Sequence, residues 1–330
     1  MFERILVPLD GSPRSEQAVA LAAHIARAHH SSIILLRSVE ILSIYSMQTV
    51  GMMEHIQRLE EQGALNYLNH IKASSMLEHV PTTTQIYVGS PALAILDVVK
   101  QHNIDLVVLC SHGYTGLKRW ALGSVAQRIA RSCPVPVLIQ RDEHPLPFNA
   151  QPTEQAIFRV CVPLDGSPQA EVVIEPALAI AAACAPPQHA EIQLLRIIEP
   201  LSPSNEENFR EIYNLDLQEL ISQQTQTYLQ DVVKRLQQTA APPDGIEITG
   251  CLSTSADIAQ EIIQYAEESD NNQSCQLLAM TTHGRDKLDR WISGSIAERI
   301  LTQTRLPLLI VRPPLPNGIN HAHQQDRSTV

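Results

Sequence analysis

The sequence lacks the features that would place a protein in a membrane or on nucleic acid. No apolar run approaches the ~18 residues that a membrane-spanning helix needs. The chain begins with a strand pattern, ILVPLD, without the layout of a signal peptide. Basic residues are scarce, since 24 Lys and Arg face 35 Asp and Glu and the net charge is −11. We therefore expect a cytoplasmic protein with no membrane span and no nucleic-acid partner.

Sites built on cysteine pairs or on phosphate-loop motifs are also missing. The six cysteines include no pair with the C-x-x-C spacing of a zinc or redox site, so they are expected to be reduced and mostly buried thiols. Neither G-x-x-x-x-G-K-[ST] nor G-x-G-x-x-G occurs, which disfavours a P-loop NTPase and a dinucleotide site. No nucleophile, base and orienting residue stand together, so we expect no catalytic residues, no metal site and no enzyme activity.

The chain does contain one pattern that occurs twice. Its 330 residues, 44% hydrophobic and 18% charged, suit two globular domains. The segment VPLDGSP stands at 7–13 and again at 162–168, and similar segments follow each copy in the same order. We predict domains at 1–141 and 157–312, a linker at 142–156 and a disordered tail at 313–330. Two duplicated copies imply a pseudo-twofold dimer inside one chain.

Within each copy, strand patterns alternate with helix patterns. Strands are expected at 3–9, 32–40, 82–88, 105–110 and 135–140, and in the second copy at 191–199, 246–252 and 308–311. Long polar helices are expected at 54–78 and 206–239, with an irregular segment at 41–53. The alternation predicts an α/β fold of two tandem, doubly wound, five-stranded parallel-sheet domains that are Rossmann-like. Ligands of such sheets bind at the carboxyl ends of the strands.

A stretch that ends in Gly-Ser follows the fourth expected strand of each copy. It reads LVVLCSHGYTGLKRWALGSV at 106–125 and LLAMTTHGRDKLDRWISGSI at 277–296, with equal spacing from His-Gly to Gly-Ser. The backbone N–H groups of Gly123, Ser124 and Val125 would point at a bound phosphate at the start of a helix. Ser124 is also a good N-cap. The alternative is an ordinary helix cap without a ligand.

Polar residues near these turns have alternative roles. Asp10 and Asp165 could accept from a ribose hydroxyl, lie near a metal carried by phosphates, or form an Asx turn that holds the next residues. His112 and His283 are interpreted as making hydrogen bonds within the turn. The basic residues of the loops could neutralise phosphates or be solvated; these are Lys118, Arg119, Lys287 and Arg290. The tryptophans, Trp120 and Trp291, are expected to pack against the loop or at the domain interface.

On these residues the chain resembles the universal stress protein family in its tandem two-domain form. The nucleotide-binding branch of that family carries G-x2-G-x9-G-[ST] after its fourth strand and an Asp at the end of its first. The second and third glycines are Gly113 and Gly123 in one half, and Gly284 and Gly294 in the other. The first glycine is replaced by a residue whose side chain is expected to narrow the space for adenosine; these residues are Cys110 and Thr281.

The resemblance implies an adenine nucleotide alpha hydrolase-like fold and a set of contacts to the nucleotide. Val39 and Ile197, after the second strands, would contact adenine, with Leu109 and Met280 beside it. The ribose would be surrounded by Pro8, Leu9, Asp10, Pro163, Leu164 and Asp165. The phosphates would lie at the helix starts, at Gly123, Ser124, Val125, Gly294, Ser295 and Ile296.

These observations leave three hypotheses for the function. The first is an adenine-nucleotide-binding regulatory protein of the stress response that binds ATP or AMP, with or without Mg²⁺. The second is an interaction protein whose pockets are vestigial and bind no nucleotide. The third is a slow ATPase that uses a metal held by phosphates and Asp10. A protein partner and a further homodimer are compatible with each hypothesis, and the sequence identifies neither.

Overall fold

The computed structural model describes most of the chain, namely residues 2–40, 50–111, 122–141, 144–147, 157–185, 189–239, 245–268, 274–282 and 294–313. The predicted linker, apart from 144–147, and the predicted disordered tail beyond residue 313 lie outside the described residues. No described helix combines the length and the apolar character that crossing a bilayer requires.

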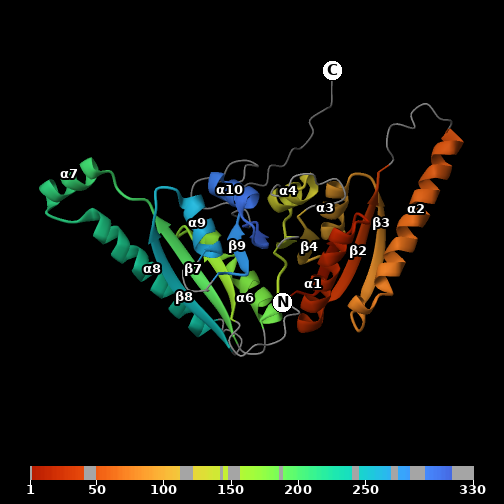
Figure 1. Ribbon diagram of the computed structural model, residues 1–330, viewed down its shortest axis with the longest axis horizontal. Coiled ribbons are helices and arrows are strands. Elements are labelled where there is room, and N and C mark those ends of the chain that lie inside the picture. Colours follow the sequence, from red (N-terminus) through yellow and green to blue (C-terminus); the bar gives the residue numbers. More distant parts are fainter. Residues whose placement is uncertain are drawn as a thin grey trace, which may run out of the picture.

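The described strands form one ten-stranded sheet with the order β3-β2-β1-β4-β5-β10-β9-β6-β7-β8 (Figure 1). The first half contributes β1 (Arg4–Pro8), β2 (Ser32–Val39), β3 (Thr82–Val88), β4 (Leu106–Cys110) and β5 (Val137–Gln140). The second half contributes β6 (Phe158–Pro163), β7 (Ala190–Ile198), β8 (Ile246–Thr254), β9 (Leu277–Thr281) and β10 (Leu308–Val311). Neighbours within each half are parallel, as predicted, so each half is a doubly wound five-stranded unit.

The helices cover both faces of this sheet. Those of the first half are α1 (Pro13–His29), α2 (Val50–Lys72), α3 (Pro91–Gln101) and α4 (Ser124–Ser132). Those of the second half are α5 (Pro168–Glu171), α6 (Ile174–Cys184), α7 (Pro203–Tyr213), α8 (Leu217–Thr239), α9 (Ile258–Glu267) and α10 (Ser295–Gln303). One core layer lies under α1, α2, α6 and α8, and the other lies under α3, α4, α9 and α10. Each layer runs through both halves of the chain.

The first helix shows why these segments fold as the sequence predicts. Ser12 is the N-cap, its side chain accepts from the Ser15 N–H, and Pro13 occupies the first helical position, where no N–H is needed. The apolar positions of α1 recur at helical spacing and face the sheet, where they are buried. The predicted strands and helices agree with the structure to within two residues, except in the segments that follow β2, β6 and β7.

Both of the predicted long helices differ from the structure in their bounds. The segment 41–53 is not irregular throughout, because α2 begins at Val50; it ends at Lys72, and a short 3-10 helix follows instead of a helix to residue 78. The helix expected at 206–239 is two helices, since Asn214 adopts a left-handed conformation with φ 51°. The second copy of the first helix also breaks, at Val172–Val173, because Pro176 cannot donate to the carbonyl four residues earlier.

The two halves meet at β5 and β10, the antiparallel pair of the sheet. Leu309 faces Leu138 across this seam, and all four residues of each strand are buried. The order of the strands on either side is related by a pseudo-twofold axis, as predicted for an internal duplication. Side chains also cross between the halves: the Arg131 guanidinium pairs with Glu298, and His29 Nε2 lies 3.0 Å from the Ala179 carbonyl oxygen.

The seam predicts that the halves unfold together. We expect Leu309→Ala to remove buried contacts to both halves and to lower the free energy of unfolding by about 2–5 kcal/mol. Urea unfolding followed by circular dichroism should remain a single transition that moves to lower urea. Leu59→Ala, at a side chain of α2 that is 59% exposed, is the matched control and should change little. Two separate transitions in the parent protein would contradict this coupling.

His29 predicts a pH dependence of stability. Burial lowers the pKa of His29, and the hydrogen bond to the Ala179 carbonyl opposes that shift in part. The folded state therefore resists protonation, so stability is complete above the ordinary histidine pKa of about 6.5 and falls as the pH drops below it. His29→Gln should flatten the fall in unfolding free energy between pH 7 and 5, whereas His79→Gln, at an exposed histidine, should not. Equal slopes for both variants would refute this assignment.

Candidate functional site

Each half places a tight Asp-Gly-Ser turn at the carboxyl end of its central strand. After β1, the Ser12 N–H and Oγ donate to Asp10 Oδ1 over 2.9 and 2.6 Å. Gly11 has φ +83°, a conformation that side chains rarely adopt. The predicted Asx turn is therefore confirmed for Asp10, with one carboxylate oxygen holding the start of α1.

The second copy repeats this geometry closely. The Ser167 N–H and Oγ donate to Asp165 Oδ1 over 2.9 and 2.5 Å, and Gly166 has φ +82°. Ser167 Oγ then accepts from the Ala170 N–H at 3.2 Å, which caps α5. The turn fixes the Asp165 carboxylate beside the crevice between β6 and β9, the point where the strand order reverses.

An arginine on the neighbouring strand lies against each turn, and the sequence analysis missed both. Arg196 Nη1 donates to the Leu164 carbonyl oxygen at 3.2 Å, one residue before Asp165. In the first half, a Cβ added to Gly11 would lie 2.5 Å from Arg37 Nη1, so the turn backbone packs directly on that guanidinium. The signal was present in the sequence, because the tripeptide Leu-Leu-Arg recurs at the same place in both repeats.

A half-buried tyrosine of the long helix in each half, Tyr67 on α2 and Tyr228 on α8, lies near the arginine of that half. The Arg37 guanidinium lies 5.3 Å from the centre of the Tyr67 ring, whose hydroxyl donates to Glu16. Burial and the Glu16 carboxylate raise the pKa of Tyr67 to about 12, so its hydroxyl stays protonated and can act as donor. In the second half Tyr228 donates to Glu171 at 2.9 Å, and burial and this hydrogen bond raise its pKa.

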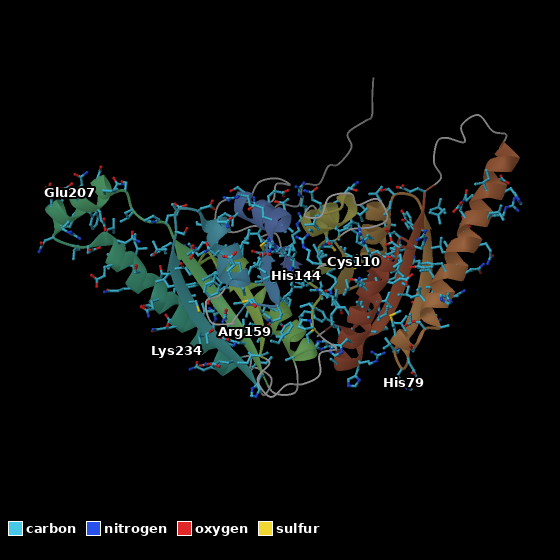
Figure 2. The ribbon with its side chains drawn as sticks, viewed as in Figure 1. His79, Cys110, His144, Arg159, Glu207 and Lys234 are labelled. Atoms are coloured by element: carbon cyan, nitrogen blue, oxygen red, sulfur yellow. The ribbon has the colours of Figure 1, made fainter. Side chains whose placement is uncertain are left out.

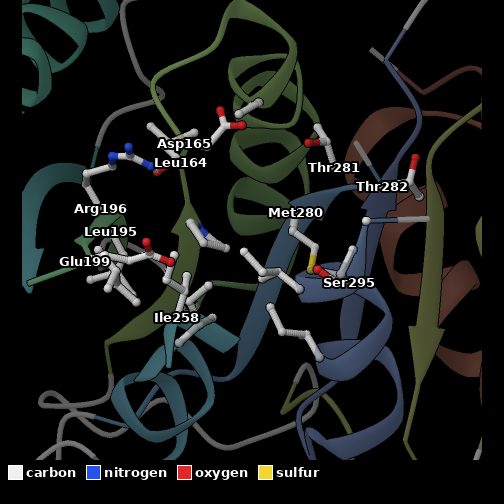
Figure 3. Close-up of a pocket in the computed structure, with 18 residues that line it drawn as sticks. Leu164, Asp165, Leu195, Arg196, Glu199, Ile258, Met280, Thr281, Thr282 and Ser295 are labelled. Carbon is white, nitrogen blue, oxygen red and sulfur yellow. Dashed lines mark hydrogen bonds between the residues drawn. The ribbon is translucent and has the colours of Figure 1, made fainter. Parts of the chain in front are cut away.

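In the second half a cavity of about 510 Å³ opens at the carboxyl ends of the strands. Asp165, Arg196 and Glu199 contribute its charged groups, while Ile197 and Met280 contribute to its apolar wall (Figure 3). The full lining is Pro163, Leu164, Asp165, Ala170, Leu195, Arg196, Ile197, Glu199, Ile258, Ile262, Met280, Thr281, Thr282, Gly294, Ser295, Ile296, Ala297 and Ile300. Every predicted site residue of this half that the structure describes lies in this lining.

Some of the remaining lining residues lie on the helices α9 and α10, where helical periodicity alone does not indicate a site. Ile258 and Ile262 lie one turn apart on α9 and face the core. Glu199 follows the end of β7, and its equivalent in the first repeat is Glu40. The predicted site residues His112, Gly113, His283 and Gly284 lie outside the described residues, as do the basic and tryptophan residues of both loops.

The helix starts differ from the prediction in two respects. Gly123 is the N-cap of α4 and Ser124 is its first helical residue, so Ser124 is not the cap. The Gly123 N–H donates to the Ser111 carbonyl oxygen at 2.8 Å, and the Gly294 N–H donates to Thr282 at 3.2 Å. These bonds tie each helix start to the preceding strand, so the two glycine N–H groups do not point at a ligand.

The next N–H groups remain suited to an anion. Helix geometry gives the N–H groups of Ser124 and Val125, and of Ser295 and Ile296, no acceptor within the helix. A glycine N-cap has no side chain to accept from them. The helix dipole adds positive potential at the same place, so both α4 and α10 begin with an arrangement that favours a negative group.

Cys110 takes a position that the sequence analysis did not anticipate. Its thiol donates to the Arg14 carbonyl oxygen at 2.9 Å and packs in the core layer beneath α1. Leu109, the residue before it, faces the other core layer (Cys110 is labelled in Figure 2). The Cys110 thiol is therefore held by the first turn of α1. Thr281, its counterpart, lines the cavity.

The pairing of strands also corrects one predicted equivalence. Leu36 pairs with Pro8 and Leu195 pairs with Pro163, so two residues further along Ser38 corresponds to Ile197. Val39 therefore corresponds to Ile198, and its side chain lies on the other face of the strand from that of Ser38. Val39 and Ile197, which were predicted for the same role, therefore occupy positions that are not equivalent.

The other predicted contacts of the first half differ in exposure. Asp10 and Ser124 are exposed, and the following are buried or half-buried: Pro8, Leu9, Leu109 and Val125.

Neither the thiols nor any other described group forms a metal centre. All six cysteines are free thiols, and all but Cys251 are buried. Burial raises the pKa of Cys133 to about 11 and that of Cys184 to about 12, so both remain protonated at neutral pH. Within the described parts of the chain, no three His, Cys, Asp or Glu side chains are grouped so that they could hold a metal ion.

The fold and the repeated turns define a tandem α/β protein in which two doubly wound units share one sheet. The chain belongs to the universal stress protein family, whose model matches residues 1–141 and 157–312. YxiE of Bacillus subtilis, a universal stress protein, is 30% identical over 148 residues, which is 43% of this chain and all of that protein. A universal stress protein of Methanocaldococcus jannaschii is 29% identical over 139 residues, which is 42% of this chain and 82% of that protein.

Two solved structures resemble almost the whole chain. A universal stress protein from Archaeoglobus fulgidus has a TM-score of 0.61 and 16% identity, and covers 94% of this chain and 98% of its own. A functionally unknown protein from Pseudomonas aeruginosa also has a TM-score of 0.61 and 16% identity, with 94% and 93% covered. At this identity the likeness shows that the fold is shared across the full tandem chain.

The hydrogen bonds of Ser167 are expected to contribute to the stability of the protein. Ser167→Ala removes the acceptor for the Ala170 N–H and a bond to Asp165, so we expect the free energy of unfolding to fall by about 1 kcal/mol. Ser202→Ala is the matched control, because Ser202 caps α7 in the same way and α7 has no buried residue. Urea unfolding should therefore be nearly unchanged in the control. Equal losses in both variants would show that the Asp165 turn has no special role in stability.

Proposed function

We propose that the protein is a cytoplasmic regulatory protein of the stress response that binds an adenine nucleotide, ATP or AMP, in the cavity of its second half. One observation carries this proposal. The Asp165 turn, an apolar wall and the N-terminus of α10 converge on one cavity of about 510 Å³. These are the three kinds of surface that a ribose, a base and a phosphate require.

The residues present fit such a ligand. Small-molecule cavities usually measure about 300–1,000 Å³ and combine apolar walls with a few polar groups. The adenine would lie against the apolar Ile197 and Met280, and a ribose hydroxyl would donate to the Asp165 carboxylate. The phosphates would accept from the N–H groups of Ser295 and Ile296 at the start of α10. A Mg²⁺ ion bound with the phosphates would find oxygen ligands nearby at Asp165 or Glu199.

The first half keeps several of the same parts, so we propose that it offers a second and different site. The Asp10 turn and the start of α4 match their counterparts in the second half. The adenine ring would contact Ser38 instead of Ile197. The Cys110 thiol donates to the Arg14 carbonyl oxygen in α1. A polar side chain in place of a large apolar one lowers the apolar area available to adenine, so we expect weaker binding in this half.

Binding is proposed to occur without rapid hydrolysis. A general base must accept a proton from the attacking water. Asp165 Oδ1 already accepts two hydrogen bonds from Ser167, so this oxygen is engaged in holding the turn. Release of phosphate from ATP at more than the uncatalysed rate, abolished by Asp165→Ala, would contradict this part of the proposal and favour an ATPase.

Calorimetric titration with ATP, ADP and AMP tests the proposal. We expect saturable binding, weakened about tenfold or more by Asp165→Ala because a charge-assisted hydrogen bond contributes roughly 1.5–3 kcal/mol. Asp165→Asn should keep the turn folded, since its amide oxygen can still accept from Ser167, and should weaken binding by a smaller factor. Asp231→Ala, at an exposed carboxylate of α8, is the control and should bind like the parent.

The outcomes separate the nucleotide hypothesis from the interaction-protein hypothesis. Mass spectrometry of the purified protein should detect an adenine nucleotide bound before any is added. If no heat is measured with any of the three nucleotides and none is found by mass spectrometry, the cavity is not a nucleotide site. If binding occurs but is equal in the parent and in Asp165→Ala, the nucleotide binds elsewhere.

A further inference from the structure

The helix α7 adds to the second half something that the α/β unit does not need. It lies between β7 and α8 and projects from the edge of the molecule (Figure 1). None of its residues is buried, so it contributes nothing to the core. It is nevertheless well defined locally: Ser202 caps its start, and Asn214 ends it in a left-handed conformation. An ordered helix without a core role has its function at the surface.

The end of α7 and the start of α8 expose a group of large apolar side chains, which we call the α7 patch. The exposed fractions are 70% for Ile212, 59% for Tyr213, 52% for Leu215 and 38% for Leu220. The Phe209 ring packs on Tyr213 with 4.7 Å between the ring centres and so orders the helical part of the patch. Contiguous exposed apolar side chains on a soluble domain usually mark a binding surface.

Acidic residues flank the residues of the α7 patch along the chain. Residues 203–220 contain five carboxylates and one arginine, Arg210. That arginine is engaged by Asp216 at 2.8 Å, which is the residue that also accepts from the Glu219 N–H to start α8. The other carboxylates of the segment are Glu206, Glu207, Glu211 and Glu219, and they give the rim a negative charge (Glu207 is labelled in Figure 2).

We propose that the α7 patch docks a basic amphipathic helix of a partner protein. The apolar residues would take the apolar face of that helix, as grooves for amphipathic helices do. The carboxylate rim would face its lysines and arginines, which favours this partner over others and speeds its association. A second copy of this chain would bring carboxylates against carboxylates, and an anionic membrane would be repelled in the same way.

Fluorescence anisotropy with the full-length protein tests this proposal. The probe is a labelled 18-residue helical peptide of leucine and lysine with one apolar face; a peptide with glutamate in place of lysine is its control. We expect saturable binding of the lysine peptide only. The double variant Ile212→Ser, Leu215→Ser should weaken it about tenfold or more. The matched control is Leu59→Ser with Leu93→Ser, which removes exposed leucines from α2 and α3 and should leave binding unchanged.

Charge reversal supplies an independent readout. Glu207→Lys with Glu211→Lys should weaken the lysine peptide about tenfold or more and reduce the dependence of binding on salt. Equal binding by the parent and the serine double variant, or equal binding of the glutamate peptide, would overturn the proposal. Dimerisation in sedimentation experiments that the serine variant abolishes, or binding to vesicles of anionic lipid that it abolishes, would assign the α7 patch to a second copy or to a membrane instead.

Discussion

The antiparallel pairing of β5 with β10 is the constraint on which the rest of this structure depends. Without it, each half would end in a strand of four buried residues with unpaired backbone groups, which is an edge that invites aggregation. The pairing closes both edges and lets each core layer run through the whole molecule.

The repeated sequence predicted the elements that are determined locally. The Asx turns of the two VPLDGSP segments and the alternation of strands and helices follow from neighbours in the chain, and the structure confirms them. The features that the sequence did not predict depend on contacts between residues that are distant in the chain. The Gly123 N–H donates to the carbonyl oxygen of Ser111, which is not its neighbour in the chain. Arg37 and Arg196 support turns that precede them by more than 20 residues.

The positions that replace the first motif glycine illustrate how strand alternation controls a site. Consecutive side chains of a strand point to opposite faces, so Leu109 and Cys110 cannot serve the same surface. Leu109 packs under α3 and α4, while the Cys110 thiol is bound to the backbone of α1. Cys110 replaces the first glycine of the motif, and its side chain is accommodated on the face of the sheet that α1 covers. The start of α4 and the Asp10 turn keep their geometry.

The two halves share the geometry of the turns that pack on the core, and they differ in residues and elements nearer the surface. The turns at Asp10 and Asp165 agree to within a degree in the φ of their glycines, because the same strand, arginine and helix cap surround both. By contrast, Ser38 of the first half corresponds to Ile197 of the second, and α7 has no counterpart among the described residues of the first half. The two copies therefore share one stable α/β unit, and they differ at Ser38 and Ile197 and in the presence of α7. An asymmetric chain of this kind can combine a ligand site and a partner surface without disturbing the seam.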